Sequence, residues 1–394
     1  MPADRTGRVV LLGASRTLTE RACALGLETL LVTTKQAVPT VDLELVDRLV
    51  VVDSYDDKLL MPLVSRAHEE TPFGACITFV ESALDTAAQI NEQLGLGWVS
   101  PETVALTRDK SLMRERLNTL GLCPVPARLC SSAAEALAFA EETGFPLIVK
   151  PPMGVASIDV RMARDADELA GMFADGRPLH VEEYIDGPEF SVETFSYSGR
   201  HVFLAIVEKR LLDGTFVEIG HTVPARLDDD AAASIRKVVS LCLDALGLTE
   251  GPAHTEVKLT PDGAKIIETH NRVGGDFIWE LVRLATDWDL CTMTLEWAAG
   301  TAPAPSWDVA ESTATSAIRF LAPPPGRVKR IFGPELLAGM PGVVKLGLFV
   351  GVGDEIPTVS QSFDRVGYVI ATASDAAAVN SVCDRASELV RFVV

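Results

Sequence analysis

Glu256, Glu268 and His270 lie on two strand-like segments that flank a short Pro-Asp-Gly turn at residues 261–263. A three-residue loop ending in glycine is a recognised hairpin connection, because glycine readily takes the left-handed conformation there. Counting outward from that loop, with position 260 paired to 264, places Glu256 directly opposite Glu268. The alternation of a strand then puts His270 on the same face as Glu268. The sequence therefore predicts that two carboxylates and one imidazole converge.

Like charges at directly opposed strand positions destabilise a hairpin. A bound divalent cation would remove the repulsion between Glu256 and Glu268, and carboxylate oxygens are the ligands that Mg²⁺ prefers. The alternative is that the two carboxylates splay into solvent on an exposed hairpin. Spacing alone leaves both interpretations open.

Hydrophobic periodicity outlines the elements that must position these groups. Apolar runs alternate with helical stretches up to about residue 107, which predicts a parallel α/β unit. An amphipathic helix over 108–121 follows, and Ser132 and Glu135 have the spacing of a capping box at the start of a second helix. A small α+β unit with strands near 145–150, 179–185 and 189–197 comes next.

Composition and charge restrict the function class. The chain has 394 residues, enough for two to three domains. Its net charge of −20 opposes a phosphate backbone, so we expect no nucleic-acid partner. No apolar run is long enough to cross a bilayer, and the N-terminus lacks a signal-peptide pattern, so we expect no membrane association and a cytoplasmic location. The seven scattered cysteines form no CxxC pair and are expected to be reduced core thiols.

An ordered set of motifs resembles the ATP-grasp superfamily from about residue 8 to the C-terminus. The set comprises Asp109-Lys110, a strand ending on Lys150, VEEYIDGPEFSVE at 181–193, Glu256 and ETHNRVGGD at 268–276. Within the superfamily, ETHNRVGG and the earlier EIGHTVPA most resemble the L-amino acid ligases and related carboxylate-amine ligases, and the tail resembles their C-terminal domain.

The resemblance implies a mixed α/β and α+β architecture, an ATP-grasp fold with an N-terminal Rossmann-like domain and a C-terminal ligase domain. The expected domains are residues 1–107, an ATP-grasp core at 108–310 with a nucleotide-clamping subdomain at about 125–188, and a ligase domain at 311–394. The implied cofactors are ATP and Mg²⁺, with Mn²⁺ as the alternative. The implied reaction converts an amino acid or related carboxylate to an acyl phosphate, which an amine opens to a dipeptide-like amide, releasing ADP and phosphate.

The resemblance also assigns residues to the nucleotide. Lys110 and Lys150 would contact the ATP phosphates beneath a loop that carries Gly154 and Ser157. The adenine and ribose would be bound by Glu182, the main chain of Glu183 and Ile185, and Glu189. The loop departs from the family pattern, because alanine and aspartate stand near expected glycines at 156 and 159. This departure puts the geometry of loop closure in question.

The remaining assignments concern the metal and the substrates. Glu256 and Glu268 match the family's metal-binding carboxylates, and His270 would be either a direct ligand or a donor to one. Arg272 would stabilise the acyl phosphate or the carboxylate substrate. Residues at the amino-acid site would be Glu81, Glu218, His221, Gly274, Gly275 and Asp276.

Two of these roles are chemically specific. Glu218 would hold an ammonium, and His221 would take a proton from the attacking amine. A polar strand edge with a structural histidine is the alternative for both. Asp276 would cap the following helix and select a cationic or amine-bearing partner.

Two other functions remain open from the sequence. One is a ligase of the same fold that loads an amino acid onto an acyl-carrier-protein arm in natural-product biosynthesis. The other is a nucleotide-binding module without turnover, suggested by the altered loop. The sequence also leaves a homodimer open.

Overall fold

A computed structural model describes residues 7–394. Its N-terminal part is a parallel sheet with the strand order β3-β2-β1-β4. The strands are β1 (Arg8–Leu12), β2 (Glu28–Thr34), β3 (Arg48–Val52) and β4 (Ala75–Ile77). The helices and 3₁₀ turns are α1 (Arg16–Ala24), η1 (Val38–Thr40), η2 (Leu43–Leu45), α2 (Leu60–Glu70), η3 (Glu81–Ala83), α3 (Leu84–Leu94) and α4 (Pro101–Arg108). β1 is buried along its whole length, as expected of a parallel strand covered on both faces.

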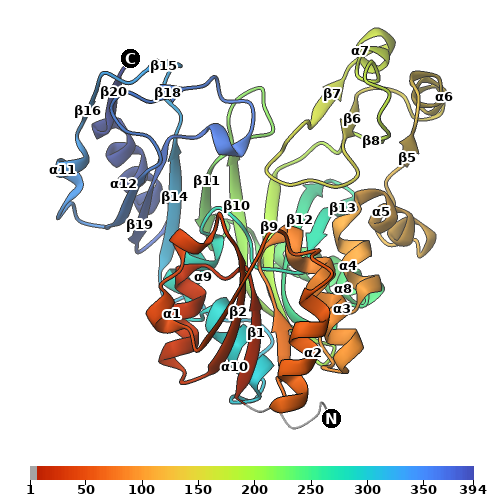
Figure 1. The fold of residues 1–394 in the computed structure, drawn as a ribbon. Coiled ribbons are helices and arrows are strands. Elements are labelled where there is room, and N and C mark those ends of the chain that lie inside the picture. Colours follow the sequence, from red (N-terminus) through yellow and green to blue (C-terminus); the bar gives the residue numbers. More distant parts are fainter. Residues whose placement is uncertain (1–6) are drawn as a thin grey trace.

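The next segment builds a separate sheet with the order β5-β8-β6-β7. Its elements, with the helix that precedes it, are α5 (Lys110–Thr119), β5 (Ala127–Cys130), α6 (Ala133–Thr143), β6 (Leu147–Lys150), β7 (Arg161–Ala163), α7 (Ala166–Gly171) and β8 (Leu179–Glu183). This small sheet has its own apolar core, formed with α6 and α7. Figure 1 shows it standing beside the body of the molecule.

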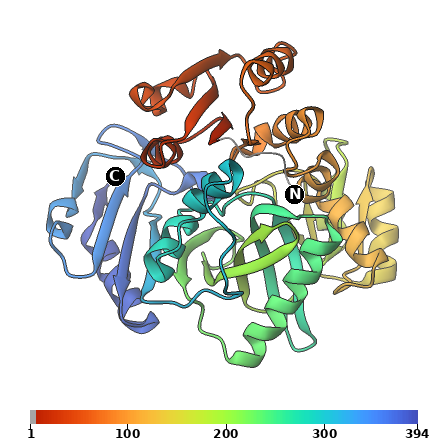
Figure 2. The same cartoon turned by 90° about the horizontal axis from the view of Figure 1, so that it is seen from below.

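An antiparallel sheet of eight strands forms the body, in the order β13-β12-β9-β10-β11-β14-β19-β17. The strands and their helices are β9 (Glu189–Tyr197), β10 (Arg200–Leu211), β11 (Glu218–Val223), α8 (Asp229–Ala245), β12 (Glu250–Thr260), β13 (Gly263–His270), α9 (Ile278–Thr286), α10 (Leu290–Ala299), β14 (Thr315–Leu321), β17 (Val343–Leu348) and β19 (Gly367–Ala373). One face packs on α8 and α5, and the other on α9 and α10. α10 also shares a core with the N-terminal sheet, which fixes that sheet against the body. Figure 2 shows the N-terminal part on the side of the large sheet that α9 and α10 cover.

The C-terminal residues complete the large sheet. Three of its eight strands follow residue 310, and β14 lies between β11 and β19. The remaining C-terminal elements are β15 (Gly326–Arg327), β16 (Arg330–Phe332), α11 (Pro334–Leu337), β18 (Glu355–Ile356), η4 (Ser362–Asp364), α12 (Ala376–Leu389) and β20 (Arg391–Val393). The large sheet thus runs without a break past residue 310.

The hairpin of β12 and β13 differs from the prediction at its turn and agrees with it further out. Thr260 pairs with Gly263, so the connection has two residues rather than three. A β-bulge at Ile267 then inserts one residue into β13. The bulge restores the predicted register, and Glu256 faces Glu268.

Two smaller expectations can be checked against the fold. All seven cysteines are unpaired, as expected, but Cys23 is exposed and Cys123 is half-buried, so these two are not core thiols. Ser132 accepts a hydrogen bond from the Glu135 amide, whereas the Glu135 carboxylate accepts from Ser131. Within residues 7–394, none of the helices combines the length and apolar character needed to traverse a bilayer.

Candidate active site

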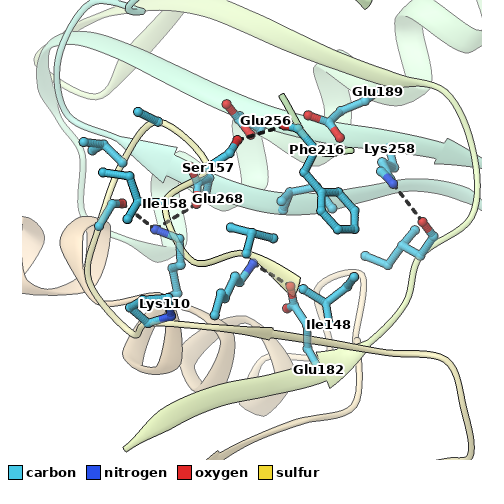
Figure 3. Close-up of a pocket in the computed structure, with 18 of the residues that line it drawn as sticks. Lys110, Ile148, Ser157, Ile158, Glu182, Glu189, Phe216, Glu256, Lys258 and Glu268 are labelled. Carbon is cyan, nitrogen blue, oxygen red and sulfur yellow. Dashed lines mark hydrogen bonds and ion pairs between the residues drawn. The ribbon is translucent and has the colours of Figure 1, made fainter. Parts of the chain in front are cut away.

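A first cavity lies between the small sheet and the large sheet (Figure 3). One wall is formed by β12 and β13, and the opposite wall by β6, β8 and the loop at 151–160. The predicted nucleotide residues line it together: Lys110, Lys150, Gly154, Ser157, Glu182, Glu183, Ile185 and Glu189. The structure therefore gathers this whole set around one space.

Lys110 is buried at the start of α5, with an exposed fraction of 8%. Asp109 caps the helix by accepting from the amides of Ser111 and Leu112. The Lys110 ammonium donates to the Gly154 carbonyl at 2.8 Å and pairs with Glu268 at 2.9 Å. Lys110 thus ties the loop above the cavity to the carboxylate below it.

Lys150 ends β6 inside a buried ionic cluster. Its Nζ lies 2.6 Å from Oε1 of Glu182, and the other oxygen of Glu182 faces His180 and Arg114. Burial would raise the pKa of Glu182, but Lys150 and the other cations hold it well below its usual range. Glu182 therefore faces the cavity as a carboxylate already held by the protein's own cations.

Two main-chain groups predicted to contact adenine already make hydrogen bonds within the protein. The Glu183 amide donates to the Pro126 carbonyl, and the Ile185 carbonyl accepts from Lys258 at 3.1 Å. Lys258 was not predicted as a site residue. It lines the cavity with its ammonium over the Tyr184 ring.

The glycine-poor loop adopts glycine-like geometry. Ala156, Ser157 and Asp159 all have left-handed φ values, of 60°, 57° and 57°. Ser157 donates to the Phe216 carbonyl, and the Ala156 carbonyl accepts from the Ser362 amide. These contacts hold a conformation that L-residues seldom adopt, at a cost typical of strained functional segments.

Replacing Ala156 with glycine should therefore stabilise the protein by about 1 kcal/mol, because glycine removes the left-handed penalty. Urea unfolding measures the change. Ala138→Gly, on the exposed face of α6, is the matched control and should cost about 1 kcal/mol. If both substitutions destabilise equally, the left-handed conformation at Ala156 is wrong.

Lys209 is the centre of the charge arrangement below the cavity. Its side chain is 1% exposed, and its Nζ lies 2.6 Å from Glu256, 3.0 Å from Glu189 and 3.3 Å from Glu218. Burial would lower the pKa of Lys209, but the three carboxylates raise it well above the ordinary value. The sequence around Lys209 does not indicate these three partners, although strand alternation places Lys209 on the same face as the buried Val207.

Glu256 and Glu268 face each other between two lysines. Burial and Glu268 both raise the pKa of Glu256, but Lys209 and His254 outweigh them and bring it to about 2. Burial likewise raises the pKa of Glu268, and Lys110 and His270 hold it well below its usual range. Both groups are therefore carboxylates at neutral pH, and both border the first cavity.

The predicted three-ligand metal set does not form as such. Within the described residues, no three His, Cys, Asp or Glu side chains gather around a common point as a metal centre requires. Nε2 of His270 lies 3.0 Å from Glu268 Oε1, which fits the second of its two predicted roles, a donor to a metal-binding carboxylate. The two facing carboxylates still fit a hard divalent cation, because oxygen is its preferred ligand and their mutual repulsion would be relieved.

A second cavity adjoins the first. The two share Glu218, Glu256, Glu268 and the loop residues Val155 and Ala156. The predicted substrate residues that line the second cavity are Glu81, Glu218, His221, Arg272, Gly275 and Asp276. Phe79, Ser362, Phe363 and Arg365 line it too and were not predicted.

Several of these side chains are already paired. Glu81 accepts from Nε of Arg272 at 2.8 Å and also pairs with Arg108, so its predicted contact with a substrate amine would compete with both arginines. Burial raises the pKa of Glu81, but Arg272, His270 and Arg108 together lower it. Glu218 holds the ammonium of Lys209 and accepts from the Ser362 hydroxyl at 3.2 Å.

The two glycines differ in what surrounds them. A Cβ on Gly274 would lie 2.8 Å from Nδ1 of His254 and 3.1 Å from Glu193, so close packing inside the protein requires glycine there. Gly274 does not line the second cavity, and its predicted substrate role has no support in the geometry. A Cβ on Gly275 would meet no atom within 4 Å.

The helix-capping prediction for Asp276 is wrong, whereas the side chain does line the second cavity as predicted. It does not cap α9, whose first turn has no side-chain cap, and its own φ is 53°. Its carboxylate instead pairs with Arg365 and with Nε2 of His221, so a cationic substrate would compete with both for this carboxylate. No sequence pattern links Arg365, 89 residues further along the chain, to this position.

These contacts give Asp276 a pH-dependent contribution to stability. Burial would raise its pKa, but the hydrogen bonds from His221 and Arg365 lower it below the ordinary 3.8. A depressed pKa contributes stability above the unfolded value and loses it as the pH falls. The difference in unfolding free energy between native protein and Asp276→Asn should therefore be largest above about pH 5 and shrink below about pH 4. A difference that stays constant over this range in urea titrations would contradict the assignment.

Comparisons with known proteins agree with this geometry. Residues 143–280 match the ATP-grasp domain, 19–97 the ATP-grasp N-terminal domain, and 319–394 the L-amino acid ligase C-terminal domain 2. An uncharacterised protein of Sinorhizobium fredii is 30% identical over 354 residues, 87% of this chain and 73% of that protein.

Two named proteins are more distant. An L-arginine-specific L-amino acid ligase of Bacillus subtilis is 25% identical over 251 residues, which cover 60% of each chain. The crystal structure of an L-amino acid ligase from Bacillus licheniformis superposes with a TM-score of 0.86 at 24% identity, over 99% of both chains. Fold, domain matches and relatives together show that the chain belongs to the ATP-grasp superfamily and is related to the L-amino acid ligases.

Proposed function

We propose that the chain is an ATP-dependent carboxylate-amine ligase that joins an amino acid, or a related carboxylate, to an amine. In the first step a carboxylate oxygen attacks the γ-phosphorus of ATP, giving an acyl phosphate and ADP. In the second step the amine nitrogen attacks the acyl carbon, the C–N bond forms, and phosphate leaves with the electron pair of the broken C–O bond. The two bimolecular steps require both substrates to meet at one point.

The observation that carries this proposal is the shared wall of the two cavities. Glu218, Glu256 and Glu268 border both spaces, so a phosphoryl group in the first and a carboxylate in the second would meet beside them. Phosphoryl transfer between anions depends mainly on positioning and charge neutralisation. Lys110 and Lys150 supply cationic groups on the nucleotide side, and Arg272 on the substrate side.

The remaining groups have consistent roles in this scheme. Glu189 would bind the ribose hydroxyls, and Glu256 and Glu268 would hold Mg²⁺, which when bound neutralises phosphate charge. Occupation of that site would compete with Lys209 and Lys110 for the two carboxylates. His221 would accept the proton of the attacking amine, and Glu218 would orient its ammonium form.

Release of ADP and phosphate from ATP with Mg²⁺ tests the proposal, across the common L-amino acids singly and in pairs. We expect release to depend on at least one amino acid and an amide product to appear with a pair. Absence of stimulation by every carboxylate would refute ligase activity and would instead support a nucleotide-binding module without turnover.

A second candidate acceptor is the arm of a carrier protein. Phe363 lines the second cavity and is 71% exposed, which gives the mouth of this cavity an apolar rim. Such a rim fits an acceptor delivered by another protein better than a free amino acid. Adding an acyl-carrier protein bearing its thiol-ended arm to the same assay distinguishes the two acceptors by mass spectrometry of the carrier.

A further inference from the structure

Arg365, in the C-terminal segment, lines the second cavity, and all three nitrogens of its guanidinium donate hydrogen bonds. Nη1 and Nη2 donate to the two Asp276 oxygens at 2.7 and 2.5 Å, and Nε donates to the Ser362 carbonyl at 2.6 Å. Nη1 also donates to the Glu218 carbonyl at 2.9 Å, and the guanidinium lies 3.6 Å from the centre of the Phe320 ring. With 6% of its surface exposed, this arginine is fixed in place.

Asp276, held by Arg365, in turn hydrogen-bonds His221. Its Oδ2 lies 3.1 Å from Nε2 of the imidazole, so Nε2 carries the proton and donates it to the carboxylate. Nδ1 then carries the lone pair. It is enclosed, and within residues 7–394 no group hydrogen-bonds to it. His221 is therefore held as a single tautomer with one free acceptor nitrogen.

The backbone at residues 276 and 277 adopts an unfavourable conformation. Asp276 and Phe277 both have left-handed φ values, of 53° and 60°, although neither is glycine. Such conformations persist where surrounding contacts impose them, and they cluster at functional sites. Asp276 also makes a two-point pairing with Arg365.

We propose that Arg365 and Asp276 are positioning residues for amide formation, and that they act by holding His221 with Nδ1 ready to accept the proton of the attacking amine. This inference rests on the proposed function and goes beyond it. The amine N–H proton moves to Nδ1 as the C–N bond forms, phosphate leaves, and the imidazolium is stabilised by the Asp276 carboxylate. Formation of the acyl phosphate involves no such proton and does not depend on Arg365 or Asp276.

The two steps can be measured separately with hydroxylamine. Hydroxylamine is largely unprotonated at neutral pH, so it traps the acyl phosphate as a hydroxamate without a base. The variants are Asp276→Asn, in which one acceptor oxygen is lost, and Arg365→Met. With an amino acid that stimulates ATP turnover, both should keep hydroxamate formation within about threefold of native, while kcat for amide formation at saturating amine falls about 10²-fold.

Arg319→Met is the matched control, because Arg319 is a similarly buried arginine on β14 that pairs with Asp384 and Asn380 and does not line the second cavity. It should preserve the native ratio of amide to hydroxamate. Equal loss of both products in the Asp276 and Arg365 variants would show a purely structural role and overturn the inference. A changed amine preference with undiminished kcat would overturn it in favour of substrate selection. If native protein forms no hydroxamate with any amino acid, the proposed function itself fails, and the inference with it.

Discussion

Glu268→Gln should lower turnover about 10²–10³-fold while the protein stays folded. Glutamine keeps the shape of the side chain but removes its charge, so Lys110 loses its ion pair at 2.9 Å. One of the two facing carboxylates is also lost, and with it half of the oxygen set proposed for Mg²⁺. The remaining geometry of β12 and β13 depends on backbone pairing and should survive.

The measurement is ADP release with the best amino acid of the panel, alongside the midpoint of thermal unfolding. Glu208→Gln is the matched control. Glu208 lies on β10, pairs with Arg226 and lines neither of the two cavities, so the turnover of this variant should stay within about twofold of native. Full activity of Glu268→Gln would refute the role given to this carboxylate.

Lys209→Met should destabilise the protein by about 3–5 kcal/mol, because breaking a buried ionic cluster leaves its partners uncompensated. Glu189, Glu218 and Glu256 would then face one another with no ammonium between them. Methionine has similar length, so the loss reports charge more than packing.

Urea unfolding at low ionic strength measures this change. Lys35→Met, which breaks the exposed pair with Asp53, should leave the free energy of unfolding close to the native value. Millimolar MgCl₂ should restore part of the stability of Lys209→Met, because a divalent cation neutralises the same carboxylates. A loss no larger than that of Lys35→Met would show that the three carboxylates do not depend on Lys209.

The pairing of Glu256 with Glu268 could be predicted from the sequence even though the predicted turn length was wrong. The sequence predicts a three-residue turn and the structure has a two-residue one, but the bulge at Ile267 compensates, so Glu256 and Glu268 still face each other. Period-two alternation and one turn signal thus sufficed to locate the pair. The ordered motifs then identified the superfamily and the fold.

The ionic partners could not be predicted in the same way. A lysine in the first turn of a helix is usually solvated, and nothing local indicates that Lys110 lies beneath Gly154. Arg365 reaches Asp276 from a 3₁₀ turn at the far end of the chain, so only tertiary packing brings them together. Left-handed alanine at 156 likewise depends on contacts with distant residues and has no signature in the sequence.

The continuous eight-stranded sheet also determines which parts of this protein can be exchanged with those of a relative. Residues 311–394 are interleaved with the body, because β14 completes the ladder of β11 and contributes Ile318 and Phe320 to the central core. A graft at that point would cut a sheet and expose an edge strand. The small sheet has its own core, so chimeras that vary the nucleotide clamp should fold, whereas acceptor preference must be redesigned residue by residue.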